Sequence, residues 1–208
     1  MLLYGFIALI VVSSCIALTN WRKGLFLMIV IGVLQDPVRK LTPGAPAIMV
    51  LCYLPVWVAT VLSLLSCGGR HWAAFKYFLP TLVNRYWLFV LTLFPAALFA
   101  FQYGLGAWKI VALGAFAYLT PLFGVVVGFS YAEHVERLRR LLFFYALFTA
   151  VMLSGGVIEY LGLTPGWLAI GTAALRMEWI RHIEWGKMIH LMVGFYRSPD
   201  VMGWHAAT

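Results

Sequence analysis

Charged residues are scarce in this chain. Only 11% of its 208 residues are charged, whereas 63% are hydrophobic. A soluble globular domain is typically about 25% charged and roughly 45–50% apolar. Several apolar runs also approach the roughly 20 residues that a helix needs to cross a bilayer. A soluble protein of this length cannot bury so many uninterrupted apolar runs in one core, so the composition excludes a soluble globular fold.

The common signatures of catalytic and metal sites are also missing. The three cysteines, Cys15, Cys52 and Cys67, are far apart, and the sequence contains no CxxC pair and no Cys/His metal spacing. It contains no P-loop, HExxH or GxSxG motif either. We therefore expect no metal and no cofactor. The N-terminus lacks a basic region before its apolar stretch, which argues against a cleavable signal peptide.

Acidic residues are the rarer charged type, with 7 Asp and Glu against 15 Lys and Arg, and the formal net charge is +8. Nucleic-acid binding is the usual first expectation for a basic chain. Here, however, the basic residues form short clusters between apolar runs, where membrane proteins carry topology signals. We expect membrane lipids as partners and no nucleic acid. The sequence does not indicate an oligomeric state.

The apolar runs predict an all-α fold, a polytopic transmembrane helix bundle with about six spans and the start of a seventh. We expect residues 1–208 to form a single transmembrane domain and residues 164–198 to form a non-spanning outer segment. The second span is short, and we expect it to stop at Asp36-Pro37. The predicted spans cover residues 2–19, 24–36, 47–66, 86–104, 108–130 and 141–163.

The basic residues also indicate on which side of the membrane each loop lies, because Lys and Arg are more frequent in cytoplasmic loops. The short loops on one side hold only Arg39, Lys40 and Lys109. This distribution favours an outside N-terminus and an outside position for residues 164–198. The apolar pattern restarts at Val201 and continues to the last residue, so we expect the chain to be the N-terminal part of a longer protein.

The outer segment and its C-terminal flank hold the residues best suited to chemistry. Arginine recognises phosphate in a bidentate manner, which makes Arg176, Arg181 and Arg197 candidates for an anion site. Arg197 lies just before Pro199, a residue suited to the first turn of a helix, and a helix N-terminus beside an arginine can hold an anion. The alternative is an interfacial loop rich in Trp and Tyr.

Three further positions carry ionisable groups near predicted membrane boundaries. His205 lies about two turns beyond Arg197 and is a functional candidate because ionisable residues at such positions are rare. Glu159 has two interpretations, a hydrogen bond to another helix or a headgroup, and a functional carboxylate. We expect Asp36-Pro37 with Arg39 and Lys40 to form a turn and an interface anchor.

One motif resembles a known family. The run Gly194-Phe-Tyr-Arg-Ser-Pro-Asp200 resembles the G-x-F-x-x-P-N motif of the O-antigen ligase and Wzy-type polysaccharide polymerase superfamily, where it follows a loop and opens a transmembrane helix. The segment from Gln35 to Gly44 is similar to one in exopolysaccharide polymerases of this type. The chain departs from the family at Asp200, where Asn is usual, and at Leu191, where Arg often stands.

The resemblance implies a metal-independent membrane glycosyltransferase of surface polysaccharide biosynthesis in the bacterial inner membrane. Such a glycan polymerase or ligase transfers a polyprenyl-pyrophosphate-linked glycan to an acceptor. Arg197, with Arg181 and Arg176, would bind the pyrophosphate, and His205 would act as acid or base.

Two other classes of function stay open. One is a multi-pass transporter or lipid-flipping subunit, for which Pro95 and Pro121 are the only hint of discontinuous helices. The other is a non-enzymatic membrane scaffold.

Overall fold

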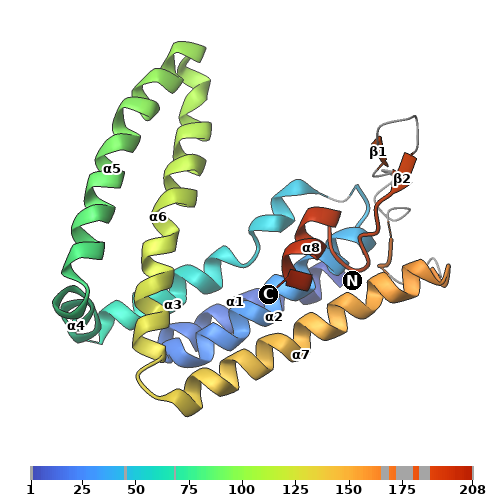
Figure 1. Ribbon diagram of the computed structural model, residues 1–208, viewed down its shortest axis with the longest axis horizontal. Helices are drawn as coiled ribbons and strands as arrows, with labels where there is room; N and C mark the ends of the chain where they lie inside the picture. Colours follow the sequence, from blue (N-terminus) through green and yellow to red (C-terminus); the bar gives the residue numbers. More distant parts are fainter. Residues whose placement is uncertain are drawn as a thin grey trace. The chain divides into compact units, whose positions relative to one another are not determined.

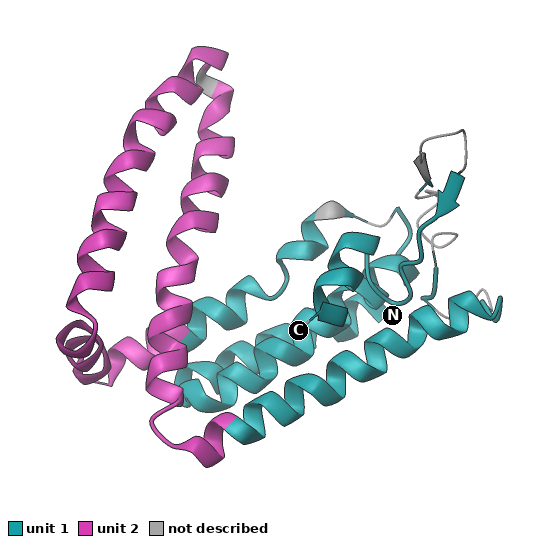
Figure 2. Cartoon of the chain, viewed as in Figure 1, with its two compact units in different colours: residues 1–60, 139–208 teal, residues 61–138 magenta. Residues whose placement is uncertain are grey.

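A computed structural model of the chain describes residues 2–44, 46–67, 69–164, 169–171, 180–182 and 188–207. Across these residues the protein consists of eight α-helices, three short 3-10 helices and one pair of short strands (Figure 1). The predicted all-α, membrane-type helical fold is confirmed. The elements divide between two compact units, unit 1 with residues 1–60 and 139–208 and unit 2 with residues 61–138 (Figure 2).

Five helical stretches in the described part of the chain are long and apolar enough to cross a membrane. Large apolar side chains on them, such as Leu91 and Phe143, are exposed, which suits contact with lipid rather than water. The protein is therefore a multi-pass membrane protein. The five are α1 (Leu2–Thr19), η1 (Ala47–Leu51) with α3 (Leu54–Ser66), α5 (Pro80–Ala100) with η2 (Phe101–Tyr103), α6 (Trp108–Tyr131) and α7 (Val135–Tyr160).

Two helices begin before the predicted spans. Helix α5 begins at Pro80 rather than at residue 86, and α7 begins at Val135 rather than at residue 141. In both places charged residues precede the predicted start: Arg85 before residue 86, and Glu136, Arg137, Arg139 and Arg140 before residue 141. A helix that leaves the membrane can continue through charged residues, and Pro80 suits the first helical turn because its missing N–H needs no partner there.

Helix α2 (Trp21–Leu41) contradicts the expected stop at Asp36-Pro37. It begins after Asn20, whose side chain accepts hydrogen bonds from the backbone N–H groups of Arg22 and Lys23, and it continues through Pro37 to Leu41. Proline inside a helix costs about 3 kcal/mol because it removes one backbone hydrogen bond. The cost is offset by tertiary contacts in this last turn, where Lys40 is buried and hydrogen-bonded.

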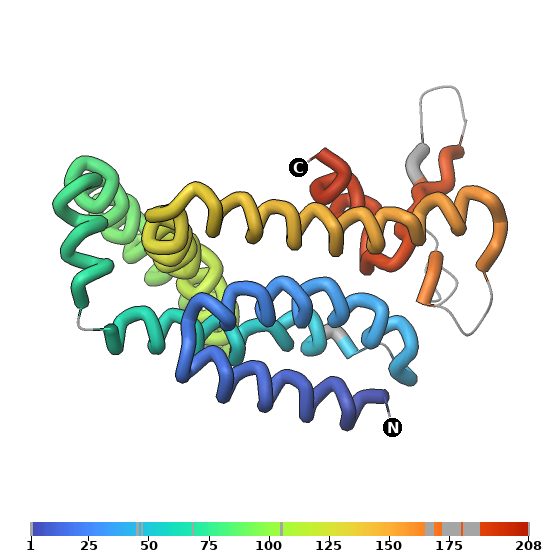
Figure 3. Tube along the Cα trace, turned by 90° about the horizontal axis from the view of Figure 1, so that it is seen from below, coloured from blue at the N-terminus to red at the C-terminus, as the bar shows by residue number. Residues whose placement is uncertain are grey.

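Helix α2 also differs from the predicted spans in composition. Charged residues stand at both of its ends, and it is not among the five candidate spans found in the described residues. It pairs with α1 in an antiparallel manner, as Figures 1 and 3 show. Phe26 of α2 contacts Phe144 of α7 edge to face, with ring centroids 5.0 Å apart.

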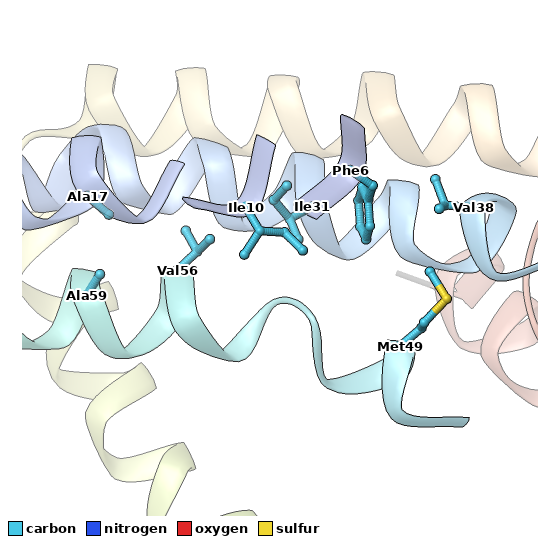
Figure 4. Close-up of a cluster of buried hydrophobic side chains, with 8 residues drawn as sticks. All are labelled: Phe6, Ile10, Ala17, Ile31, Val38, Met49, Val56 and Ala59. Atoms are coloured by element: carbon cyan, nitrogen blue, oxygen red, sulfur yellow. The ribbon is translucent and has the colours of Figure 1, made fainter. Parts of the chain in front are cut away.

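The core of unit 1 lies between α1, α2 and α3 with η1 (Figure 4). Close approach of these helices depends on small residues: a Cβ added at Gly24 would lie 2.9 Å from Ala17 Cβ and would collide with the Thr60 hydroxyl. The cluster of buried side chains consists of Phe6, Ile10, Ala17, Ile31, Val38, Met49, Val56 and Ala59.

Unit 2 contains α4 (Arg70–Phe78), α5 and α6, with η3 (Leu105–Ala107) before α6. Phe75 of α4 is fully buried and contacts Phe129 of α6 edge to face at 5.5 Å. Helices α5 and α6 form an antiparallel pair, and the Tyr86 hydroxyl donates to the Tyr118 carbonyl at 2.9 Å. Both helices continue through their internal prolines.

The part of the chain after α7 also belongs to unit 1. The short strand β1 (Ile180–His182) pairs antiparallel with β2 (Met188–His190). Helix α8 (Pro199–Ala207) then begins at Pro199, the residue that the sequence predicted as its first.

Candidate functional site

A cavity of about 220 Å³, lined by both polar and apolar side chains, lies in unit 1. Helix α2 provides one wall, and the opposite side comes from α7, α8 and the residues just before α8. Gly32 leaves space in the α2 wall because a Cβ added there would meet nothing within 4 Å. The residues that line the cavity are Ile29, Gly32, Val33, Gln35, Asp36, Tyr145, Tyr196, Arg197, Val201 and His205.

The cavity contains two of the four residues that the sequence predicted as site residues. Arg197 and His205 both line it. Arg181 lies in β1, where the structure describes the backbone only, and Arg176 lies outside the described residues. The structure therefore brings together the arginine of the Gly194–Asp200 motif and the histidine of the following helix.

Arg197 is held against the end of α2 by Asp36. Its backbone N–H donates to Asp36 Oδ2 at 3.2 Å, and its guanidinium Nη1 lies 4.0 Å from Asp36 Oδ1. The Arg197 side chain is 32% exposed, whereas the Asp36 side chain is 5% exposed. The expected role of Asp36-Pro37 as a turn and interface anchor is wrong, because the carboxylate is buried and fixes the motif.

Two more charged residues hold the backbone of the motif. The Lys40 ammonium donates to the Gly194 carbonyl at 2.7 Å. One oxygen of Glu159, Oε2, accepts the backbone N–H groups of Val193 at 2.9 Å and Gly194 at 2.6 Å. Glu159 thus forms hydrogen bonds, as one interpretation expected, although its partners are backbone groups of the motif. Lys40 is buried and is not an interface anchor.

Small residues let the motif approach α7 closely. A Cβ added at Gly194 would lie 2.5 Å from the Gly156 nitrogen and 2.9 Å from the Gly155 carbonyl carbon. Gly194 also has φ +52°, a left-handed conformation that favours glycine. Gly155 and Gly156 in turn leave room for Phe195 and Met202. These contacts explain why the first residue of the motif is glycine.

His205 is positioned by two tyrosines. Its Nδ1 lies 2.7 Å from the Tyr145 hydroxyl, and its ring stacks on the Tyr196 ring with centroids 5.0 Å apart and 14° between planes. Burial lowers the pKa of His205, and the Asp36 charge opposes this effect. Because the ordinary value is already 6.5, this shift favours the neutral form of the ring at pH 7.

Burial also shifts the pKa of three other ionisable groups at or near the cavity, all outside the five candidate spans: Asp36, Lys40 and Tyr196. It raises the pKa of Asp36, against the opposing charge of Arg197. It lowers the pKa of Lys40 to about 8, with Glu159 opposing, and raises the pKa of Tyr196 to about 12. The charges of Asp36 and Lys40 are therefore disfavoured by desolvation and partly stabilised by opposite charges, whereas Tyr145 and Asp36 raise the pKa of Tyr196 further.

Four residues at the site were not predicted from the sequence as site residues: Gln35, Asp36, Lys40 and Tyr145. Asp36 and Lys40 have the i, i+4 spacing that places two side chains on one helical face. That spacing could have indicated that the two side chains act together, but Pro37 between them indicated a turn. Nothing in the sequence marks Tyr145 as a site residue, because a tyrosine in an apolar helix is common.

No group of three or more potential metal ligands occurs among the described residues. Comparison with family models, curated proteins and solved structures finds no match for this chain. The fold and the site define it as a multi-pass α-helical membrane protein with a cavity that contains an arginine and a histidine.

Proposed function

We propose that this chain belongs to a glycan polymerase or ligase of the bacterial inner membrane, which transfers a polyprenyl-pyrophosphate-linked glycan to an acceptor. The observation that supports the proposal is that Arg197 and His205 line one cavity. An arginine for a pyrophosphate and a neutral histidine for a proton are two groups that this reaction requires. The apolar helices suit the polyprenyl chain of the donor.

The proposed reaction is a single substitution at the anomeric carbon of the donor sugar. An acceptor hydroxyl oxygen attacks this carbon, the bond from carbon to pyrophosphate oxygen breaks, and the bonding electrons leave with the polyprenyl pyrophosphate. Arg197 stabilises the negative charge of the leaving group. His205 takes the acceptor proton on Nε2, which requires that Nδ1 carries a hydrogen and donates to Tyr145.

The transporter alternative has no specific observation in its favour. It rested on Pro95 and Pro121 as signs of discontinuous helices. Both prolines lie within helices that continue through them.

A binding experiment tests the pyrophosphate part of the proposal. The purified chain in lipid nanodiscs should bind farnesyl pyrophosphate more tightly than farnesol. Arg197→Ala should weaken this binding by about tenfold or more, because a hydrogen bond to a charged group contributes about 1.5–3 kcal/mol. Arg139→Ala, which changes an exposed arginine of α7, should leave binding unchanged. Equal binding of both ligands would contradict the proposal.

The transfer step needs the protein that contains this chain and a polyprenyl-pyrophosphate-linked oligosaccharide. His205→Gln should slow the release of polyprenyl pyrophosphate while farnesyl pyrophosphate still binds, because glutamine cannot take the proton. Unchanged release in this variant would exclude His205 as the base.

A further inference from the structure

Basic side chains gather at the end of unit 1 that lies opposite the Gly194–Asp200 motif. Within this unit, helix α2 and residues 139–160 of α7 run side by side and in the same direction, as Figures 1 and 3 show. The C-terminal parts of both helices hold the motif through Lys40 and Glu159, so their N-terminal parts also lie together. There the Phe26 and Phe144 rings join the two helices, with centroids 5.0 Å apart.

Three basic residues stand one turn before this aromatic contact. Arg22 and Lys23 precede Phe26 by four and three positions, and Arg140 precedes Phe144 by four. Residues three or four apart share a helical face, so the three side chains lie on the facing sides of α2 and α7. Among the described residues, no carboxylate lies within ion-pair distance of any of them. Their positive charge is therefore available to an anion from outside the chain.

Arg22 is half-buried and held in place by its neighbours, whereas Lys23 and Arg140 are exposed. The backbone N–H of Arg22 donates to the Asn20 side chain at 3.1 Å, and its guanidinium lies 5.4 Å from the centre of the Trp21 ring. Trp21 is itself only 5% exposed. Because Arg22 is already ordered, it loses little conformational freedom when it binds an anion.

The face of α7 that continues from Arg140 is apolar and exposed. At about 100° per residue, Leu147 and Val151 lie within about 20° of Arg140 around the helix axis, about two and three turns further on. Leu147 is 52% exposed and Val151 is 59% exposed. Both belong to a helix long enough to cross the membrane, so they suit contact with hydrocarbon. A molecule with an anionic end and an apolar chain therefore matches this face better than a free inorganic anion does.

We propose that this end of the α2–α7 pair is a binding site for an anionic phospholipid. Arg22, Lys23 and Arg140 hold the phosphate of its headgroup, because arginine donates to phosphate in a bidentate manner and lysine attracts it as a point charge. One acyl chain lies along Leu147 and Val151. The distribution of basic residues predicts that this end is cytoplasmic, where anionic lipids attract basic segments. The site is independent of the proposed glycan transfer, since none of its residues lines the cavity.

Removal of single charges tests the site. The purified chain in detergent is titrated with phosphatidylglycerol or phosphatidylcholine, and native mass spectrometry measures the dissociation constant of the first bound lipid. Phosphatidylglycerol should bind more tightly than phosphatidylcholine, which carries no net charge. Arg22→Gln and Arg140→Gln should each weaken phosphatidylglycerol binding by about fivefold, the attraction of one basic side chain to an anionic membrane surface. Neither change should alter phosphatidylcholine binding.

Arg139→Gln is the matched control, because it removes the same charge from the same helix. Arg139 is exposed and lies about 140° from Phe144 around α7, on a side that does not face α2. Phosphatidylglycerol should bind this variant as tightly as it binds the unchanged protein. Thermal unfolding of each variant verifies that it is folded.

Three results would overturn the site. Equal dissociation constants for the two lipids would show that the headgroup charge is not recognised. Equal effects of Arg139→Gln and Arg140→Gln, including no effect of either, would show that binding does not depend on the position of the charge. Displacement of phosphatidylglycerol by an equal concentration of inorganic phosphate would show that the cluster binds a free anion rather than a lipid.

Discussion

At the scale of single residues, Gly194 has the strictest requirement in the site. Its φ is +52°, and its Cα lies so close to α7 that an added Cβ would be 2.5 Å from the Gly156 nitrogen. The obstructing atoms are backbone atoms of a helix, which cannot rotate away. Any side chain here must therefore push the motif away from α7 and weaken the hydrogen bond that Gly194 N–H donates to Glu159 and the one that Gly194 accepts from Lys40.

Gly194→Ala should lower the free energy of unfolding by about 3 kcal/mol. Left-handed strain contributes about 1–2 kcal/mol and overpacking contributes about 1–3 kcal/mol. Unfolding of the purified protein in detergent by denaturant measures the effect. Gly203→Ala in α8 is the control, because an added Cβ there meets nothing, and it should be neutral or stabilising by up to about 1 kcal/mol. Equal stability of the two variants would contradict the close packing at Gly194.

His205 should make the stability of the protein depend on pH. Burial lowers its pKa in the folded state below the ordinary value of 6.5. Its contribution is therefore fully present above pH 6.5 and is lost as the pH falls through the lowered pKa, because the unfolded chain then binds the proton more tightly. Thermal unfolding temperatures should fall more steeply between about pH 6.5 and 5 for the unchanged protein than for His205→Gln. Parallel profiles would show that His205 titrates normally.

At the scale of elements, helix bounds were predicted most accurately where an apolar run is not interrupted by charged residues or proline. The spans at residues 2–19 and 108–130 have no charged residue at their apolar centres, and α1 and α6 have nearly these bounds. Helix α2 was predicted incorrectly because a proline and three charged residues follow its apolar run within six positions. Local preference indicates a turn there, whereas contacts with a distant segment maintain the helix.

At the candidate site, too, residues placed by local sequence were predicted, and residues placed by contacts with distant segments were not. Arg197 was predicted from its place before Pro199, and α8 begins there because proline suits a first turn. Asp36 and Lys40 were not predicted, because their partners, Arg197 and Gly194, are 161 and 154 positions away. A single sequence carries no record of such a pairing. The burial of these two charges is explained only by the motif that packs against the end of α2 and supplies their hydrogen-bond partners.

At the scale of the whole molecule, the site is assembled from the two ends of unit 1, which enclose unit 2 in the sequence. Helix α7 is the element that returns the chain to unit 1, and it contributes Tyr145, Glu159 and the two glycines beneath the motif. Its 26 residues give a length of about 39 Å, enough to cross a hydrocarbon core of about 30 Å. The position of its two ends therefore decides on which side of the membrane the motif lies.

The turn before α7 and the end of α7 should lie on opposite sides of the membrane. The distribution of basic residues predicts the turn inside and the end of α7 outside. Single cysteines at Ala132 and Leu161, both exposed, should therefore react with an impermeant maleimide from opposite sides. Leu161→Cys should be labelled in intact cells and Ala132→Cys only in inverted vesicles. The background for both variants replaces Cys15, Cys52 and Cys67 by alanine.

Each possible labelling result has a distinct meaning for the site. Labelling of both positions from one side would show that α7 does not cross the membrane. Reversed labelling would keep α7 as a span but place the motif in the cytoplasm, where a glycan acceptor of the outer face cannot reach it. The predicted result alone leaves Arg197 and His205 on the side that the proposed glycan transfer requires, because α7 and the motif are joined through Glu159 and Gly194.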